Sequence, residues 1–277
     1  MSTIKVERLV RDYGGGKGVF DVSFHVDQGE AFGFLGPNGA GKTTTIRHLM
    51  GFLKPASGEC SINGLDCWRE RDKVQAKLGY IPGEISFFED LSGTEFLKFI
   101  AEYRKIGIQN RREELLERFE LDPRNKIKKM SKGMKQKLGI IAAFMHDPDI
   151  LILDEPTSGL DPLMQNRFID LIAEEKKHGK TILMSSHMFE EVERTCDRIG
   201  IIRKGSMVAV DAAAALRERH TRSYTVTLES ESAAEAFAID FNGTRNGLKV
   251  TVTTKQSLEE IFMNYYGGEK HDEHGAV

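Results

Sequence analysis

The chain has 277 residues, a formal net charge of −3 and a hydrophobic fraction of 40%. This length suffices for one large domain with a small appendage, and the composition is ordinary for a globular protein. The charge argues against a polybasic binder of nucleic acid or membrane surfaces, so no nucleic-acid partner is expected. We find no apolar run near the roughly 20 residues that cross a bilayer, and no signal-peptide pattern. The three cysteines lack C-x-x-C spacing, so no disulfide framework or zinc site is predicted.

The first segment of the chain predicts sheet structure. Between Ile4 and Val26, the apolar residues Phe20, Val22 and Phe24 alternate with polar ones, as a strand with one buried face requires. We interpret this segment as an antiparallel edge. The next apolar run, from Glu30 to Leu35, predicts a short buried strand.

The segment after this strand fits the phosphate-loop pattern G-x-x-x-x-G-K-[ST] and leads into a helical pattern that reaches Met50. Such a loop brings several backbone N–H groups to the phosphates at a helix N-terminus, so the segment predicts a nucleoside triphosphate site. We expect the Lys42 ammonium to contact the β and γ phosphates and the Thr43 hydroxyl to bind Mg²⁺. The predicted loop residues are Gly36, Pro37, Asn38, Gly39, Ala40, Gly41, Lys42, Thr43 and Thr44.

A helical block, at about residues 84–148, interrupts the α/β pattern. It opens with a capping-box signature from Ser92 to Glu95, and a second helix is predicted from Asn110. A third helix is predicted from Ser131, a residue type that suits an N-cap.

The apolar run that begins at Ile150 ends in two carboxylates, Asp154 and Glu155. Ligands of open parallel sheets bind beyond the carboxyl ends of the strands, so we expect both carboxylates to face the phosphate site. Asp154 is then the predicted Mg²⁺ partner, and Glu155 the base that orients the attacking water. The elements predicted next are a helix at 168–177, a strand at 181–185, a helix at 189–196 and a strand at 199–203.

The pattern changes again near Tyr224. Two alternating runs, at 224–228 and 248–252, precede a helical pattern from Ser257 to Tyr266. We therefore predict an α/β protein with a phosphate-loop core at residues 1–217, an antiparallel β edge and a helical subdomain. A small α+β appendage is predicted at residues 218–277 and should pack on the main body or on a second copy.

Two further segments, Met130–Lys137 (MSKGMKQK) and Ser185–His187 (SSH), narrow the choice among nucleotide hydrolases. In order and spacing, the whole set resembles the ATP-binding-cassette family over roughly the first 215 residues. The phosphate loop takes the place of Walker A in that family, and Ile150–Glu155 the place of Walker B. The resemblance implies that ATP is the nucleotide.

The resemblance also implies roles for five more residues. Ser131 and Gly133 occupy the family signature position, which contacts the γ-phosphate held by an opposite subunit. Asp161 ends the D-loop, His187 is the switch histidine, and Tyr13 stands where an aromatic ring stacks on adenine. A homodimer with two ATP molecules between its subunits is therefore expected.

One segment departs from the family pattern. Gly83 stands where a glutamine is usual after the strand that ends at Ile81. A glycine has no side chain to contact Mg²⁺ or water, so our hypothesis is that the neighbouring Glu84 partly takes this role. Met134 is a second departure and leaves Ser131 and Gly133 in place.

The signature segment and the appendage look most like ATPase subunits of bacterial exporters of the multidrug or bacitracin-resistance kind. This resemblance implies ATP hydrolysis that drives a separate transmembrane permease, with the chain held peripherally at the cytoplasmic face of the membrane. The alternative is a soluble ATPase of the same family that acts on a non-membrane complex. A regulatory module without useful hydrolysis is a further alternative, against which Asp154, Glu155 and His187 argue.

Overall fold

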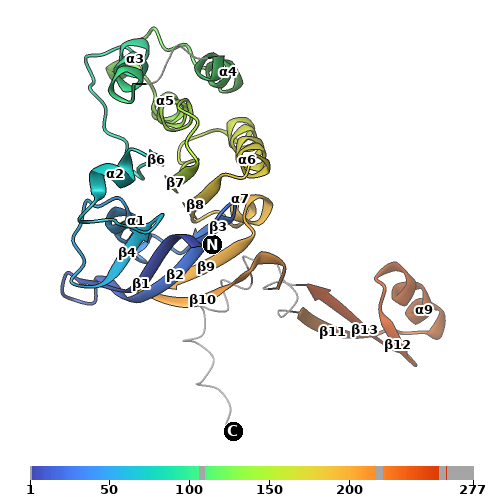
Figure 1. Cartoon of the computed structure of the whole chain (residues 1–277). Coiled ribbons are helices and arrows are strands. Elements are labelled where there is room, and N and C mark those ends of the chain that lie inside the picture. The colour runs from blue at the N-terminus through green and yellow to red at the C-terminus, as the bar shows by residue number, and fades with distance from the viewer. Residues whose placement is uncertain (1, 106–109, 216–220, 256–259, 261–277) are drawn as a thin grey trace. The chain divides into compact units, whose positions relative to one another are not determined.

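The computed structural model describes residues 2–105, 110–215, 221–255 and 260. They belong to two compact units, unit 1 (Met1–Val210) and unit 2 (Asp211–Val277) (Figure 1). The predicted boundary between residues 217 and 218 lies outside the described residues, as does the predicted helix at 257–266 apart from Glu260.

Unit 1 is built around a six-stranded, mainly parallel sheet. Across the sheet, the strands are β10 (Ser206–Ala212), β9 (Arg198–Arg203), β3 (Ala31–Leu35), β8 (Thr181–Ser186), β7 (Ile150–Asp154) and β6 (Leu78–Ile81). Neighbouring strands from β9 to β6 are parallel. Every residue of β3, β7 and β8 is buried, as expected for parallel strands covered on both faces.

The register of this sheet aligns the carboxyl ends of three strands. Leu35 at the end of β3 pairs with Ser186 of β8, and Ser185 pairs with Asp154 at the end of β7. The loops that follow these strands therefore begin side by side at one edge of the sheet, although they lie far apart in the sequence.

The predicted antiparallel edge is a separate sheet rather than an extension of the parallel one. Its strands, in order, are β2 (Gly18–Asp27), β1 (Ser2–Asp12), β4 (Ser57–Ile62) and β5 (Leu65–Asp66). The two sheets share one core, in which the Phe24 ring stacks on Phe32 with centroids 5.1 Å apart. The sequence analysis did not predict β4, β5 or β10.

Four helices flank these sheets: α1 (Lys42–Leu49), α2 (Arg71–Gln75), α6 (Pro162–Lys177) and α7 (Phe189–Thr195). Ile46 and Leu49 of α1 are fully buried in the shared core, which fixes the start of the helix beside β3. Helix α6 begins before its predicted start at Phe168. Asp161 caps it, and the fixed φ of Pro162 suits the first helical position.

The helical block is present where it was predicted. It contains α3 (Gly93–Tyr103), α4 (Asn110–Arg118), the short 3₁₀ helix η1 (Ile127–Lys129) and α5 (Lys132–Phe144). Ser92 and Glu95 form the predicted capping box, with the Ser92 N–H donating to the Glu95 carboxylate at 2.6 Å.

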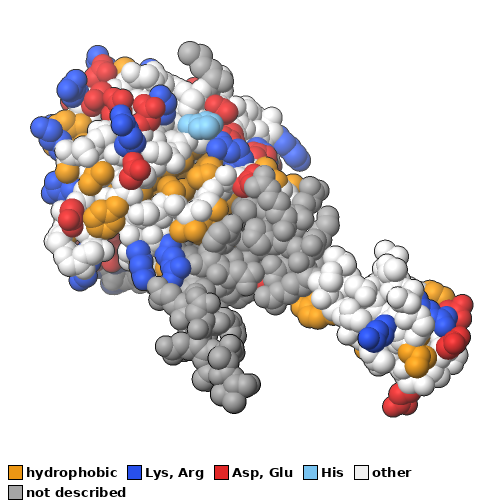
Figure 2. Space-filling view, turned by 90° about the horizontal axis from the view of Figure 1, so that it is seen from below, with side chains coloured by type: hydrophobic (Ala, Val, Ile, Leu, Met, Phe, Trp, Pro, Cys, Tyr) orange, Lys and Arg blue, Asp and Glu red, His pale blue; other side chains and the backbone are white. Residues whose placement is uncertain are grey.

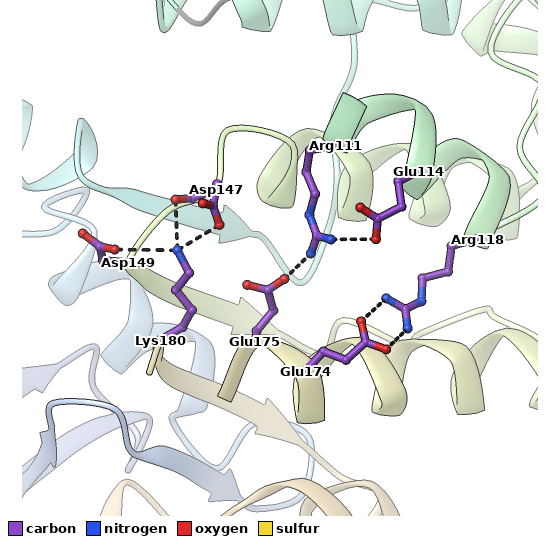
Figure 3. Close-up of polar contacts among 8 residues, drawn as sticks. All are labelled: Arg111, Glu114, Arg118, Asp147, Asp149, Glu174, Glu175 and Lys180. Atoms are coloured by element: carbon purple, nitrogen blue, oxygen red, sulfur yellow. Dashed lines mark hydrogen bonds and ion pairs between the residues drawn. The ribbon is translucent and has the colours of Figure 1, made fainter. Parts of the chain in front are cut away.

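Ion pairs join the helical block to the parallel core (Figure 3). From α4, Arg111 pairs with Glu175 and Arg118 with Glu174, both carboxylates lying on α6. The Glu175 residue is 2% exposed, and burial raises the pKa of its carboxyl. Because a buried carboxylate without a cation is costly, Arg111 ties the position of α4 to that of α6.

The part of unit 2 that the structure describes contains a three-stranded antiparallel sheet and the helix α9. Its elements are β11 (Thr221–Thr227), α9 (Glu231–Asp240), β12 (Thr244–Asn246) and β13 (Lys249–Lys255). The strand order is β11-β13-β12, and Ala234 of α9 and Val250 of β13 are fully buried. The two alternating runs were predicted, whereas α9 was missed because its short, alanine-rich sequence has little apolar periodicity.

Candidate nucleotide-binding site

The phosphate loop lies between β3 and α1, as predicted. Gly39 and Gly41 have φ values of +80° and +114°, which side chains rarely tolerate. A Cβ on Gly41 would also lie 2.9 Å from a methyl of Val19. The loop tip, from Pro37 to Gly39, is exposed, and the first turn of α1 has no side-chain cap. Its backbone N–H groups are thus available to an anion.

Lys42 is the central cation of the site. The residue is only 4% exposed, and its ammonium donates hydrogen bonds to the carbonyls of Gly36, at 2.6 Å, and Pro37, at 3.2 Å. The same Nζ atom lies 3.3 Å from Oε1 of Glu155. This carboxylate compensates a charge that would otherwise be desolvated without a partner.

The end of β7 supplies both predicted carboxylates. Asp154 is fully buried and accepts a hydrogen bond from the Ser185 hydroxyl through Oδ1. Its other oxygen, Oδ2, is buried with no hydrogen bond from any described residue, and a Cβ on Gly83 would lie 3.0 Å from it. A buried, anionic oxygen without a donor suits a cation or the water of a hydrated cation, so Asp154 fits the predicted Mg²⁺ role.

Glu155 takes an unusual backbone conformation, with a φ of +48°. Its N–H is held by the Ser185 carbonyl at 3.1 Å, which keeps the chain in this strained turn. The carboxylate then lies between the Lys42 ammonium and the His187 imidazole, with Oε1 near Lys42 and Oε2 3.3 Å from Nδ1 of His187. The structure therefore brings together three residues that the sequence placed on three separate loops.

A cavity of about 470 Å³ opens beside the phosphate loop. Tyr13 lies at its edge, 51% exposed, and the Arg11 guanidinium carbon is 5.3 Å from the centroid of its ring. Lys17 and Gly18 also line it, and the sequence analysis did not identify them. The lining residues are Tyr13, Lys17, Gly18, Pro37, Asn38, Gly39, Gly41, Lys42, Thr43, Thr44 and Glu155.

The residues of the signature segment and the D-loop do not line this cavity. Ser131 accepts a hydrogen bond from Met134 N at 3.2 Å and caps α5, while Asp161 accepts one from Met164 N at 3.0 Å and caps α6. A Cβ on Gly133 would lie 2.9 Å from the Gly159 carbonyl, so the two segments touch each other. Within one chain, Ser131, Gly133 and Asp161 thus form a second surface.

A phosphate loop followed by a buried cation, an acidic strand end and a histidine defines a site for binding and hydrolysing a nucleoside triphosphate. Comparison with known proteins agrees with this class. The ABC transporter family model matches residues 19–158. The linearmycin resistance ATP-binding protein LnrL of Bacillus subtilis is 36% identical over 254 residues, which cover 90% of this chain and 82% of that protein.

Two further matches cover most of the chain. The bacitracin transport ATP-binding protein BcrA of Bacillus licheniformis is 38% identical over 240 residues, which cover 84% of this chain and 78% of that protein. A solved ATP-binding subunit of an ABC transporter is 34% identical, with a TM-score of 0.71, and the match covers 79% of this chain and 93% of that one. This chain belongs to the ABC transporter family, as an ATP-binding subunit with ATPase activity.

Proposed function

We propose that this chain energises a separate transmembrane permease and that the assembly is an exporter. Two relatives support the direction of transport, because their names refer to linearmycin resistance and bacitracin transport and they match most of this chain. The observation that carries the catalytic part is the placement of Glu155 between Lys42 and His187.

The ion pairs of the site suggest how ATP binding prepares hydrolysis. Lys42 pairs with Glu155 at 3.3 Å, and the β and γ phosphates bring more negative charge to the same ammonium. Their arrival frees the Glu155 carboxylate to hold a water molecule and accept its proton. The water oxygen then attacks the γ-phosphorus, and ADP leaves. In this proposal, His187 orients the Glu155 carboxylate through its contact with Oε2 and also contacts the γ-phosphate.

Two residues are suited to hold magnesium. The Thr43 hydroxyl belongs to the first turn of α1 beside the cavity, and Oδ2 of Asp154 is buried without a hydrogen bond from a described residue. When bound, Mg²⁺ would offset the charge of the phosphates. Glu84 is exposed and next to Gly83, which supports its proposed part in holding the ion through water.

A second copy of the chain completes the site in this proposal. Ser131 is exposed at the N-terminus of α5, where backbone N–H groups favour an anion. Lys132, in the same first turn, donates to the Ser158 hydroxyl at 3.2 Å, and its positive charge there would favour an anion, whereas Lys135 already pairs with Glu89 at 3.1 Å. The surface formed by Ser131, Gly133 and Asp161 would then face the ATP of the other copy.

An exposed aromatic cluster supports docking of the permease on the helical block. Phe88, Phe99 and Tyr103 are 61%, 44% and 76% exposed. Their rings contact each other, with centroids 5.7 Å apart for Phe88 and Phe99 and 6.4 Å for Phe99 and Tyr103. Exposed aromatic clusters of this kind are typical of protein interfaces.

Binding to a permease would also place the chain at the cytoplasmic face of the membrane. None of the helices in the described ranges is long and apolar enough to span a bilayer. On the face seen in Figure 2, Lys and Arg side chains lie among Asp and Glu side chains, which gives no support to direct adhesion to lipid or nucleic acid.

The test is purification of the tagged, full-length chain from detergent-solubilised membranes of its host. Mass spectrometry should identify a polytopic membrane protein in stoichiometric amount. Recovery from the soluble fraction alone, or with a non-membrane complex, would instead favour the soluble ATPase. As a control, replacing Phe99 and Tyr103 by Ser should reduce recovery of the partner while ATP binding persists.

A further inference from the structure

Glu191 is a buried carboxyl group beside the site that the mechanism above does not use. It lies on α7, four residues after His187, and is 2% exposed. Carboxylates are seldom buried so fully without a partner, so its position calls for a physical reason.

The strongest contact of Glu191 is with the turn that carries His187. Oε2 of Glu191 accepts a hydrogen bond from the Ser186 hydroxyl at 2.6 Å, and the same hydroxyl oxygen accepts one from Met188 N at 2.9 Å. The residues on both sides of His187 are thus linked to one carboxylate. The backbone at His187 has little freedom to rotate as long as this link holds.

The second oxygen of the carboxylate faces the segment that follows Glu155. Oε1 is buried and accepts no hydrogen bond from a described residue. Thr157, which is 4% exposed and two residues after Glu155, lines a cavity of about 110 Å³ together with Glu191 and Met188. The carboxyl group therefore lies between the loop of the predicted base and the loop of the switch histidine.

The electrostatic environment agrees with this placement. Burial raises the pKa of the Glu191 carboxyl, while the Ser186 and Thr157 hydroxyls and the nearby His187 lower it. The Ser186 hydroxyl, which donates to Oε2, is thus one of the groups that favour the ionised form against the effect of burial.

We propose that Glu191 is a positioning residue for ATP hydrolysis: its hydrogen bond from Ser186 and its packing beside Thr157 hold His187 and Glu155 in a fixed mutual arrangement. It touches no reacting atom. This inference rests on the proposed roles of Glu155 and His187 and assigns a further residue to them. A misplaced base or histidine lowers the rate of the chemical step without weakening ATP binding, because Lys42 and the phosphate loop stay in place.

The test compares variants of the full-length chain at protein concentrations where the rate per chain is constant. All rates are divided by the concentration of ATP-binding sites, so that a smaller fraction of folded protein does not lower the calculated kcat. Glu191→Ala should lower kcat about tenfold or more with KM within about twofold, and Ser186→Ala should do likewise. Glu191→Gln should retain kcat within about threefold, because its amide oxygen can still accept the hydrogen bond from the Ser186 hydroxyl.

Two further variants isolate the mechanism. If the carboxylate acts through Ser186, the Ser186→Ala and Glu191→Ala double variant should lose no more than the worse single variant. Glu190→Gln is the matched control on the same helix, since Glu190 is exposed and its nearest cation, on Arg194, is 3.8 Å away. It should leave kcat unchanged.

Full turnover per site in Glu191→Ala would overturn the inference. A fall in kcat in the double variant equal to the product of the two single falls would overturn it as well. A rise in KM in step with the fall in kcat would do so too, because it would indicate general damage to the site. Glu155→Gln, measured alongside, separates the two proposals. If Glu155→Gln retains turnover, the proposed role of Glu155 fails, whatever Glu191 does.

Discussion

At the scale of single residues, one carboxylate carries two functions. In the described structure, Glu155 neutralises the buried Lys42 ammonium. In the proposed mechanism, the phosphates of ATP replace Glu155 as the partner of this ammonium, and Glu155 then acts as a base. Its positive φ and the hydrogen bond to Ser185 hold the side chain where both partners reach it. Strain of this kind is costly and persists only where the surroundings enforce it.

Replacing Glu155 by Gln should lower kcat by about 100-fold or more and leave ATP binding intact, because the amide accepts no proton. Turnover and nucleotide binding are measured on the same preparation. ATP binding should become tighter, because the variant has no carboxylate that competes with the phosphates for Lys42. Retention of most turnover would remove Glu155 from the role of base.

The substitution of Glu84 by Ala should raise the Mg²⁺ concentration needed for half-maximal turnover several-fold, if the Glu84 carboxylate makes the contact to hydrated Mg²⁺ that Gly83, without a side chain, cannot make. The measurement is a Mg²⁺ titration of ATPase rate at fixed ATP. Asp90→Ala is the control, because this exposed carboxylate pairs with Lys128 on the helical block. An unchanged titration curve in Glu84→Ala would show that the role is lost or lies elsewhere.

At the scale of elements, α6 is the member of the core on which the helical block rests. Arg111 and Arg118 of α4 both reach carboxylates of α6, and Lys180, which leads into β8, pairs with Asp147 at 2.9 Å (Figure 3). Of the carboxylates in these pairs, only that of Glu175 is deeply buried. The free energy of this contact should therefore be concentrated in the Arg111 and Glu175 pair.

Arg111→Met should reduce the free energy of unfolding by about 3 kcal/mol at neutral pH, because it leaves Glu175 buried without its cation. The raised pKa of Glu175 determines the pH dependence. A group that is easier to protonate in the folded state favours folding at low pH, so the deficit should shrink as pH falls and the carboxyl is neutralised.

Denaturant unfolding at two pH values measures both effects. Arg112→Met is the matched control, because Arg112 pairs with the exposed Glu113 on the same helix, and it should change stability by less than about 0.5 kcal/mol. Equal losses in the two variants would show that burial of Glu175 is not the source.

At the scale of the whole molecule, the predicted ATP contacts lie on two surfaces of one chain. One surface is the cavity at the phosphate loop, and the other carries Ser131, Gly133 and Asp161, none of which lines that cavity. Head-to-tail pairing of two copies would bring one kind of surface against the other at two equivalent sites.

Glu155→Gln in the presence of ATP should therefore convert chains of 31.1 kDa into dimers, whereas ADP should leave them monomeric. Light scattering after size exclusion gives the mass directly. In the same background, Ser131→Arg should prevent the shift while the monomer still binds ATP. A dimer that forms equally without nucleotide would contradict ATP as the bridging group.

The local features of this protein could be predicted from its sequence. The phosphate loop, the acidic strand end, the capping box at Ser92 and the parallel strands follow from short-range spacing and periodicity, and the structure contains them. Short-range patterns were weaker for β4 and α9, whose sequences SGECSI and ESAAEAFAID have little apolar periodicity, and for β5, which has two residues.

The contacts between residues far apart in the chain became visible in the folded structure. The register of β3, β8 and β7 places Lys42, His187 and Glu155 within ion-pair distance, and no local pattern encodes that alignment. The same holds for Glu191, which reads as one more charged residue of a surface helix until the fold buries it against Ser186. Burial and cross-strand register depend on segments far apart in the chain, so they arise only when those segments pack together.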